Sequence, residues 1–448
     1  MKPITLREVA SACGGILHGD PDTLITSIVT DSRQAQGGSL FAAIKGARAD
    51  GHRFIPMTVE QGAVCALCED APDVDVAYIQ VESVLTALKG IAAYYRSLFT
   101  IPFIGITGSV GKTSTKEFIA SVLSQKYRVH KTAGNFNNEL GVPLTLFGLE
   151  EYHEVAVIEM GISDFGEMTR LAKMVRPDIS VITNIGCCHL ENLGDRDGVL
   201  KAKTEMFAYL NDNASIILCH DDDKLSTVTE YKGITPTFYG TSDSDEYRAA
   251  DIVEKGLDGT DCILIHGDMR VSVTIPTMGR HHVLNALCAM AVGDKLGLDA
   301  GDIKRGIESF HNVGSRNKLI KTADYTIIDD CYNANPTSVT ASLNTLSKLS
   351  GRRVAILGDM KELGSNELTL HKGVGEYAKQ KGIDILVAVG ELSKKTAEGF
   401  SDGAVYFETV DDCIAQLGSI LQKGDTVLVK ASHSMHFEKI TEAISSEE

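Results

Sequence analysis

A glycine-rich segment in the first third of the chain reads Gly105-Ile106-Thr107-Gly108-Ser109-Val110-Gly111-Lys112-Thr113-Ser114. The apolar run 103–106 predicts a buried strand before it, and apolar residues at helical spacing over 118–123 predict a helix after it. Between a strand and a helix, backbone N–H groups and the helix dipole bind phosphate groups. The spacing departs from the strict G-x-x-x-x-G-K-[ST] pattern, whose first glycine would stand at Ile106. We therefore predict a variant phosphate-binding loop; the alternative is a glycine turn with a solvated lysine.

Two residues of this loop have predicted roles in nucleotide binding. Lys112 would neutralise the β and γ phosphates, and Thr113 would bind Mg2+ through its hydroxyl. Glu159 follows the apolar run 155–158, so a parallel sheet would place it at the same edge as the loop, as a carboxylate ligand for that ion. A strand that ends in a carboxylate by chance is the alternative. The other predicted loop residues are Thr107, Gly108, Ser109, Val110, Gly111 and Ser114.

The pattern around this loop predicts the domain organisation. Apolar strands alternate with amphipathic helices, which is typical of a parallel sheet covered by helices, and the same rhythm restarts after about residue 313. The first part of the chain has shorter β-rich runs separated by glycine turns. We predict an α/β protein of three domains: a small N-terminal module over 1–98, a central P-loop mononucleotide-binding domain with a mainly parallel sheet over 99–312, and a C-terminal Rossmann-like domain over 313–448.

Composition excludes several classes of protein. The 448 residues contain 43 Lys and Arg against 60 Asp and Glu, a net charge of −17, so a nucleic acid is not expected as a partner. No stretch approaches the roughly 18 apolar residues of a membrane span, and the start lacks the apolar core of a secretion signal, so we expect a cytoplasmic protein without membrane insertion. Ten scattered cysteines are too few for a disulfide framework.

Four further residues are candidates whose patterns leave alternatives open. His189 follows an apolar strand and is either a nitrogen ligand for a second cation, a donor to a phosphoryl group, or structural. Lys203 lies in a charge run that is typical of an exposed helix face. Asn285 would contact a base edge or cap a helix, and Asp330 would contact a ribose or a cation unless it belongs only to a turn.

The order of these motifs resembles the Mur ligase family of ATP-dependent amide-bond-forming enzymes of bacterial wall synthesis, over nearly the whole chain. The motifs that carry the resemblance are Asp31-Ser32-Arg33, Asp50-Gly51-His52, Thr107–Ser114, Gly134–Gly141, Glu159-Met-Gly161, Thr183–Gly186 with His189-Leu-Glu191, Ala202-Lys203, Gly279–Asn285, Arg316, Asp330–Pro336 and Gly358–Gly364. The Tyr-Asn-Ala-Asn and Gly-Asp-Met-x-Glu-Leu-Gly runs resemble the member that joins D-alanyl-D-alanine to UDP-N-acetylmuramoyl-tripeptide.

The resemblance implies a reaction and its cofactors. ATP would phosphorylate the terminal carboxylate of the UDP-muramoyl peptide, and the amine of D-alanyl-D-alanine would displace phosphate from the acyl phosphate. Two Mg2+ ions are expected. Thr113 and Glu159 match the ligands of the first and His189 a ligand of the second, while Lys203 matches a lysine that the family carries in carbamylated form. Carbamylation replaces an ammonium by an anion, which favours a cation nearby.

The resemblance also implies binding roles outside the loop. Asn285, Arg316 and Asp330 match positions that contact the adenine, phosphate and ribose of ATP. Ser32 and Arg33 match the site of the uridine diphosphate, and Asn135 and Asn138 match the path to the reacting carboxylate. Three histidines depart from the family pattern: His220, His282 and His433.

Other functions would leave different signals in the sequence. A GTPase switch would need Asn-Lys-x-Asp, but Asn317-Lys318 is followed by Leu319-Ile320. A sibling ligase remains the alternative, either the enzyme that adds the third residue or a folylpolyglutamate synthetase. We expect a monomer.

Overall fold

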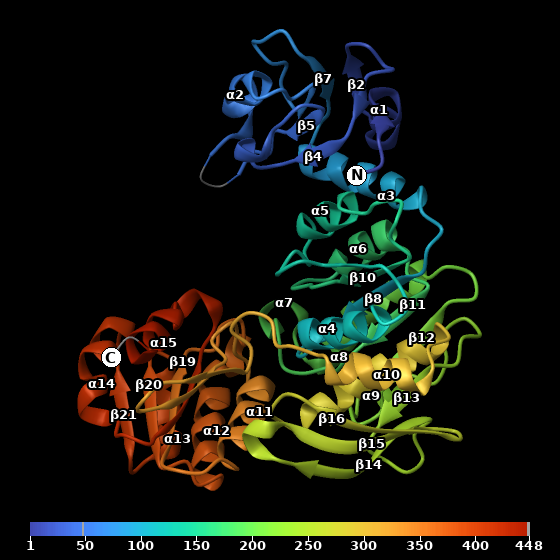
Figure 1. Ribbon diagram of the computed structural model, residues 1–448. Helices are drawn as coiled ribbons and strands as arrows, with labels where there is room; N and C mark the ends of the chain where they lie inside the picture. Colours follow the sequence, from blue (N-terminus) through green and yellow to red (C-terminus); the bar gives the residue numbers. More distant parts are fainter. Residues whose placement is uncertain (47–48, 446–448) are drawn as a thin grey trace.

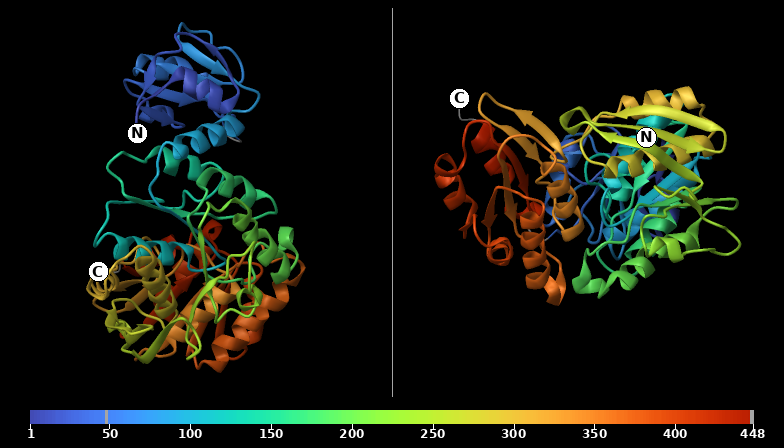
Figure 2. Two further views of the ribbon diagram at one scale, coloured as in Figure 1. Left: turned by 90° about the vertical axis from the view of Figure 1, so that its right-hand side faces the viewer. Right: turned by 90° about the horizontal axis from the view of Figure 1, so that it is seen from below.

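The computed structural model describes residues 1–46 and 49–445, and these form three α/β domains. In Figure 1 the N-terminal domain (blue) lies at one end of the central domain (teal to yellow), and the C-terminal domain (orange to red) lies beside the central domain. The two views of Figure 2 show the same arrangement from the side and from below. The predicted fold class is confirmed. No helix among the described residues is both long and apolar enough to cross a membrane.

The N-terminal domain is built on a small five-stranded sheet. Its elements are β1 (Ile4–Thr5), α1 (Leu6–Cys13), β2 (Ile16–His18), β3 (Leu24–Ile25), β4 (Ser27–Val29), β5 (Ser39–Ala42), α2 (Ile55–Glu60), β6 (Cys65–Cys68), β7 (Ala77–Gln80) and α3 (Val84–Ser97). The sheet order is β2-β7-β6-β5-β4, parallel except for β2. Helix α1 starts at a capping box in which Thr5 and Glu8 bond each other's backbone N–H groups. Helix α3 leads into the central domain.

The central domain has one nine-stranded sheet. Its elements are β8 (Phe103–Thr107), α4 (Lys112–Leu123), β9 (Val129–Lys131), α5 (Gly141–Phe147), β10 (Val155–Glu159), α6 (Glu167–Val175), β11 (Ile179–Ile182), α7 (Leu190–Leu193), α8 (Arg196–Thr204), β12 (Ser215–Cys219), β13 (Thr237–Gly240), β14 (Tyr247–Glu254), β15 (Thr260–His266), β16 (Met269–Ile275), α9 (His281–Lys295) and α10 (Ala300–Glu308). The order is β16-β15-β14-β13-β12-β11-β8-β10-β9, antiparallel only at β14-β15-β16.

The order of the central strands fixes where a ligand can bind. The chain passes from β8 to β9 and β10 on one side and then to β11 on the other side of β8. The connections after β8 and β11 therefore diverge at the carboxyl edge of the sheet, where ligands bind in open α/β sheets. These strands are buried throughout. Because this sheet is covered by helices, its apolar strands form a rigid base for the loops at that edge.

The C-terminal domain repeats this architecture with six strands. Its elements are β17 (Lys318–Lys321), β18 (Thr326–Asp329), α11 (Pro336–Leu346), β19 (Arg353–Gly358), α12 (Glu367–Gln380), β20 (Ile385–Val389), α13 (Ser393–Phe400), β21 (Ala404–Phe407), α14 (Val410–Ile420), β22 (Thr426–Lys430) and α15 (Glu438–Ser445). The order is β17-β18-β22-β19-β20-β21, and only β17 is antiparallel. Two separate apolar clusters fill this domain. The carboxyl ends of β18 and β22 carry the residues that reach the shared cavity described next.

Candidate active site

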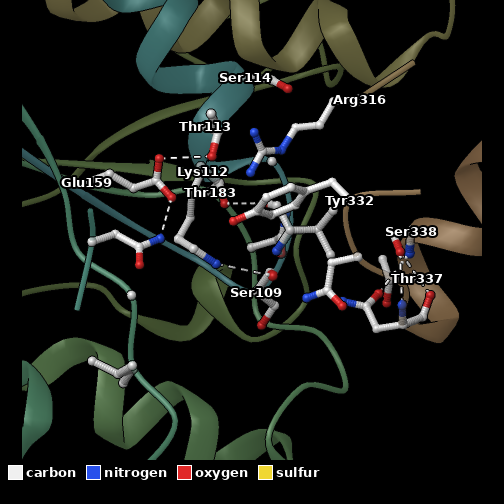
Figure 3. A pocket seen from close by; sticks show the side chains of 18 of the residues that line it. Ser109, Lys112, Thr113, Ser114, Glu159, Thr183, Arg316, Tyr332, Thr337 and Ser338 are labelled. Carbon is white, nitrogen blue, oxygen red and sulfur yellow. Dashed lines mark hydrogen bonds between the residues drawn. The ribbon is translucent and has the colours of Figure 1, made fainter. Parts of the chain in front are cut away.

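A cavity of about 870 Å³ lies between the central and C-terminal domains. Both sheets contribute to it through the loops at their carboxyl edges, and Figure 3 shows side chains from the two domains facing one another. The predicted site residues that line it are Ser109, Val110, Gly111, Lys112, Thr113, Ser114, Asn138, Glu159, His189, Asn285, Arg316 and Asp330. The structure thus brings together residues more than 200 positions apart in the sequence.

The predicted phosphate loop connects β8 to α4. Gly108 has φ +149° and Gly111 has φ +81°, both unfavourable for residues with a side chain, and Gly111 is the residue before the helix. Lys112 is the first residue of α4, and its Nζ donates to the carbonyl of Gly108 at 2.7 Å. The carbonyl of Ser109 lies 3.5 Å from the same ammonium group, so the lysine side chain folds back over the loop.

Asn184 and Thr183, which had no predicted role of their own, hold the loop in this shape. The side-chain oxygen of Asn184 accepts from the N–H of Val110 at 2.9 Å, and its amide donates to the carbonyl of Val110 at 2.9 Å. Thr183 Oγ1 donates to the same carbonyl at 2.7 Å. Both residues follow β11, the strand beside β8. The sequence signal that could have identified them is their position after a buried strand, because neighbouring parallel strands end at the same edge of a sheet.

Gly108→Ala should destabilise the protein. A Cβ at Gly108 would lie 1.9 Å from Thr183 Oγ1, and the backbone has a φ that favours glycine. We expect the free energy of unfolding to fall by about 2–4 kcal/mol and nucleotide binding to weaken. Denaturant unfolding and nucleotide titration measure the two effects. Gly373→Ala in α12 is the control, since nothing lies within 4 Å of its added Cβ; equal effects of the two substitutions would contradict the prediction.

Glu159 lies at the end of β10 beside the loop. The residue is 1% exposed, and its Oε2 accepts from Thr113 Oγ1 at 2.9 Å while its Oε1 accepts from Asn137 Nδ2 at 2.8 Å. The Nζ of Lys116 lies 3.7 Å from Oε2. A carboxylate and a hydroxyl at the mouth of a phosphate loop fit Mg2+, which prefers hard oxygen ligands. Asn137 was named in the sequence only as part of a motif, and its contact with Glu159 comes from the tertiary structure.

The cavity offers few protein ligands for a metal ion. Within the part of the chain that the structure describes, no three His, Cys, Asp or Glu residues lie close enough together to hold one. An ion at Thr113 and Glu159 would therefore complete its coordination with water and nucleotide phosphates. This is the usual arrangement for Mg2+ in nucleotide-dependent enzymes.

His189 and Lys203 come from the segment between β11 and β12. His189 precedes α7 and lines the cavity, with Nδ1 2.6 Å from Glu362 Oε2 of the C-terminal domain. Lys203 lies on α8 and is 1% exposed, whereas Lys201 on the same helix is exposed. The interpretation of Lys203 as part of a solvated helix face is therefore wrong.

Lys203 is buried, and among the described residues no carboxylate forms an ion pair with it. Its pKa is lowered to about 8, mainly because burial disfavours the charged form; Cys188 opposes this shift, and the charge of Lys112 adds to it. It does not line the cavity directly. When the pKa of a buried lysine is lowered in this way, a fraction of the molecules carries a neutral amine near neutral pH. The neutral amine is the reactive form of this side chain.

The C-terminal domain contributes the other side of the cavity. The Arg316 guanidinium carbon lies 3.7 Å from the centre of the Tyr332 ring, an arrangement visible in Figure 3. The Asp330 carboxylate accepts from Lys430 Nζ at 2.5 Å and from Ser342 Oγ at 2.7 Å. Lys430, at the end of β22, was not among the predicted site residues. It anchors Asp330 at the carboxyl edge of the sheet.

Asn285 has a structural contact in addition to its place in the cavity. Its Oδ1 accepts from Thr115 Oγ1 at 3.0 Å, and its Nδ2 lies 3.1 Å from His282 Nδ1. The bond to Thr115 joins α9 to α4 within a buried layer, whereas His282 belongs to α9 itself. Asn285 is inside α9 and does not cap it. Its contact with a base stays a prediction.

Several predicted residues lie away from the cavity lining. Ser32 and Arg33 are in a short 3-10 turn of the N-terminal domain, where Arg33 bonds Asp31 at 2.6 Å on the surface. Asn135 does not line the cavity, whereas the nearby Asn138 does and accepts from the first N–H of α5 at 2.8 Å. Thr107, the last residue of β8, and Gly108 do not line the cavity.

Three family models match successive parts of the chain. The model described as "Mur ligase family, catalytic domain" matches residues 24–96, "Mur ligase middle domain" matches 106–293, and "Mur ligase, glutamate ligase domain" matches 315–433. The chain belongs to the Mur ligase family. The resemblance predicted from the motifs is confirmed.

Individual relatives of this Mur ligase are similar over their full length. The UDP-N-acetylmuramoyl-tripeptide--D-alanyl-D-alanine ligase of Bacillus subtilis is 37% identical over 97% of each chain. A crystal structure of MurF from Acinetobacter baumannii superposes with a TM-score of 0.94 at 31% identity and covers 100% of both chains. A MurF ligase from Thermotoga maritima in complex with ADP has a TM-score of 0.82 at 29% identity, covering 94% of this chain and 97% of that one.

The three histidines that depart from the Mur ligase pattern have structural surroundings. His282 is 2% exposed, and the centre of its ring lies 5.9 Å from that of Phe118 in α4, so it belongs to the packing between helices. His220 pairs with the buried Asp245. The ring of His433 lies 5.7 Å from that of Tyr332. His282 and His433 each lie beside a ring that lines the cavity, that of His281 and that of Tyr332.

Proposed function

We propose that this Mur ligase joins D-alanyl-D-alanine to UDP-N-acetylmuramoyl-tripeptide in peptidoglycan synthesis, with conversion of ATP to ADP and phosphate. The observation that carries the proposal is the shared cavity, where the phosphate loop and Glu159 face Arg316 and Asp330 of the other domain. The full-length similarity to enzymes named for this reaction supports the choice of substrates.

The reaction proceeds in two steps. The γ-phosphoryl group of ATP is transferred to the terminal carboxylate of the tripeptide, giving an acyl phosphate and ADP. The amine of D-alanyl-D-alanine then attacks the acyl carbon, a C–N bond forms, and phosphate leaves with loss of one proton from the amine. Phosphorylation is required because a carboxylate is a poor electrophile.

The first step brings two anions together, and the chain's own cations make this possible. Lys112 faces the phosphates from the loop, and Arg316 faces them from the C-terminal domain once its guanidinium leaves Tyr332. The loop N–H groups hold the phosphate oxygens. Fixed donors in a partly enclosed cavity stabilise developing charge better than water does.

We propose two Mg2+ ions for this site. Thr113 and Glu159 would hold the first, and His189 with carbamylated Lys203 would hold or orient the second. When bound, the ions supply neutralisation of phosphate charge. Carbamylation would turn the buried Lys203 from a repelling cation into an anion, and its lowered pKa favours that modification.

The rest of the substrate assignment follows the domains. We propose that 1–98 binds the UDP-sugar through Ser32 and Arg33, that 99–312 binds ATP, and that 313–448 completes the ligase site. Asn135 and Asn138 would line the path of the peptide, and Asn285 and Asp330 would contact adenine and ribose. A monomer in the cytoplasm, where nucleotide-linked precursors and ATP are available, fits this assignment.

Phosphate release should require both substrates. ATP and Mg2+ would be mixed with the protein, with UDP-N-acetylmuramoyl-tripeptide and D-alanyl-D-alanine added separately and then together. We expect release above background only with both, together with UDP-N-acetylmuramoyl-pentapeptide in the mass spectrum. Release that ignores both substrates would contradict the proposal, and a product carrying one amino acid in place of the dipeptide would indicate a sibling ligase.

A further inference from the structure

Two residues with unusual backbone conformations meet across the interface between the central and C-terminal domains. His189 has φ +52° and Glu362 has φ +64°, the left-handed region that favours glycine. His189 Nδ1 lies 2.6 Å from Glu362 Oε2, close in distance although the N–H is not aligned as a full hydrogen bond. Such alignment is often completed only when ligands bind.

The loop that presents Glu362 is held firmly by its own domain. The Asp359 carboxylate accepts from the backbone N–H of Ser393 at 2.8 Å and from its hydroxyl at 2.9 Å. The N–H of Met360 donates to His371 Nε2 at 2.9 Å. These buried contacts hold Asp359 and Met360, and they therefore fix the position of Glu362 in the same loop.

The same loop also approaches the central domain closely. A Cβ at Gly364 would lie 3.3 Å from the backbone nitrogen of Glu191 in α7, so little space remains between the two segments. The contact joins the Gly358–Gly364 motif to the segment that carries His189. The motif starts at the end of β19, so it reaches the cavity from the C-terminal domain.

Stabilisation of the docked domains does not by itself account for the contact between His189 and Glu362. The Glu362 side chain is 59% exposed, and ion pairs at such positions add little to stability. Left-handed backbone at two residues with side chains costs free energy on both sides of the interface. Strain of this kind persists mainly where it places a functional group, and His189 lines the cavity.

We propose that Glu362 is a positioning residue that accepts the Nδ1 proton of His189 and so leaves Nε2 free to bind a cation in the cavity. The proposal rests on the proposed function, which gives His189 a cation. A carboxylate bonded to one ring nitrogen fixes both the ring orientation and the nitrogen that remains available. Because the two residues belong to different domains, this nitrogen is presented only when the domains are docked.

Cation binding without turnover tests the proposal. Mn2+ binding to the full-length protein with ADP would be followed by electron paramagnetic resonance for the wild type, Glu362→Gln and Glu391→Gln. The last removes an exposed carboxylate of the same domain and serves as the charge-matched control. A double variant with His189→Gln measures the coupling, and thermal unfolding checks that each variant is folded.

We expect Glu362→Gln to weaken the binding of one Mn2+ ion by roughly 10-fold or more, as outer carboxylates of metal-bound histidines do, with no further loss when His189→Gln is added. Glu391→Gln should bind like the wild type. Equal Mn2+ affinities of the wild type and Glu362→Gln, or additive losses in the double variant, would overturn the inference. Failure of the wild type to form the pentapeptide product would instead overturn the proposed function.

Discussion

Lys112→Met should lower the rate of phosphate release in the presence of both substrates by roughly 10²–10³-fold, because it removes the cation that faces the transferring phosphoryl group. In the structure its ammonium lies inside the loop, 2.7 Å from the carbonyl of Gly108, and is placed to turn toward a bound phosphate. Methionine keeps much of the length of the side chain. We therefore expect kcat to fall more than the affinity for ADP.

The measurement is steady-state phosphate release, with ADP titration as the binding control. Lys173→Met is the matched substitution, since Lys173 is an exposed lysine of α6 outside the cavity. It should retain wild-type kinetics. A Lys112→Met variant with near wild-type kcat would show that phosphoryl transfer does not depend on this ammonium and would favour the glycine turn with a solvated lysine.

Lys203→Met should also reduce activity by about 10²-fold or more, because the variant cannot be carbamylated and leaves the cavity without the proposed anion. The direct test is a spectrum of the protein incubated with 13C-labelled bicarbonate. We expect a carbamate signal in the wild type and none in Lys203→Met. Lys201→Met, two residues away on the exposed side of α8, should keep both the signal and the activity.

The carbamate signal should depend on pH in a defined direction. Only the neutral amine reacts with carbon dioxide, and burial lowers the pKa of Lys203 from 10.5 to about 8. At pH 7 roughly one tenth of the amine is neutral, against about one part in three thousand for an ordinary lysine. Because carbamate formation also releases a proton, at constant dissolved carbon dioxide the signal should rise with pH and reach half of its maximum at a lower pH than the signal of an exposed lysine with an ordinary pKa. A half-maximal signal at the pH found for exposed lysines, or a signal that persists in Lys203→Met, would contradict the assignment.

The phosphate loop illustrates what local sequence can predict. Its glycines, the lysine and the threonine stand between a predicted strand and a predicted helix, and the structure has β8 and α4 there. Glu159 could be placed at the same edge because parallel strands end together. These predictions depend on residues within one strand-loop-helix unit or on the direction of neighbouring strands, both of which the hydrophobic pattern determines.

Other site contacts could not be predicted because they cross between elements. Lys430 and Asp330 are 100 residues apart and meet only because β22 lies beside β18. Asn285 contacts Thr115 through the packing of α9 on α4. Strand order and helix packing are set by the whole domain, so a linear pattern carries little information about such pairs.

The sequence by itself determined the α/β class, the strand-loop-helix unit around the glycine-rich loop and, through its motifs, the family. Only the tertiary structure decided that Lys203 is buried while Lys201 is exposed, since the charge run is the same for both. It also decided that Glu362 reaches His189 from another domain. The physical reason is that hydrophobic periodicity fixes local elements, whereas the burial, pKa and partners of a polar side chain depend on which elements pack against it.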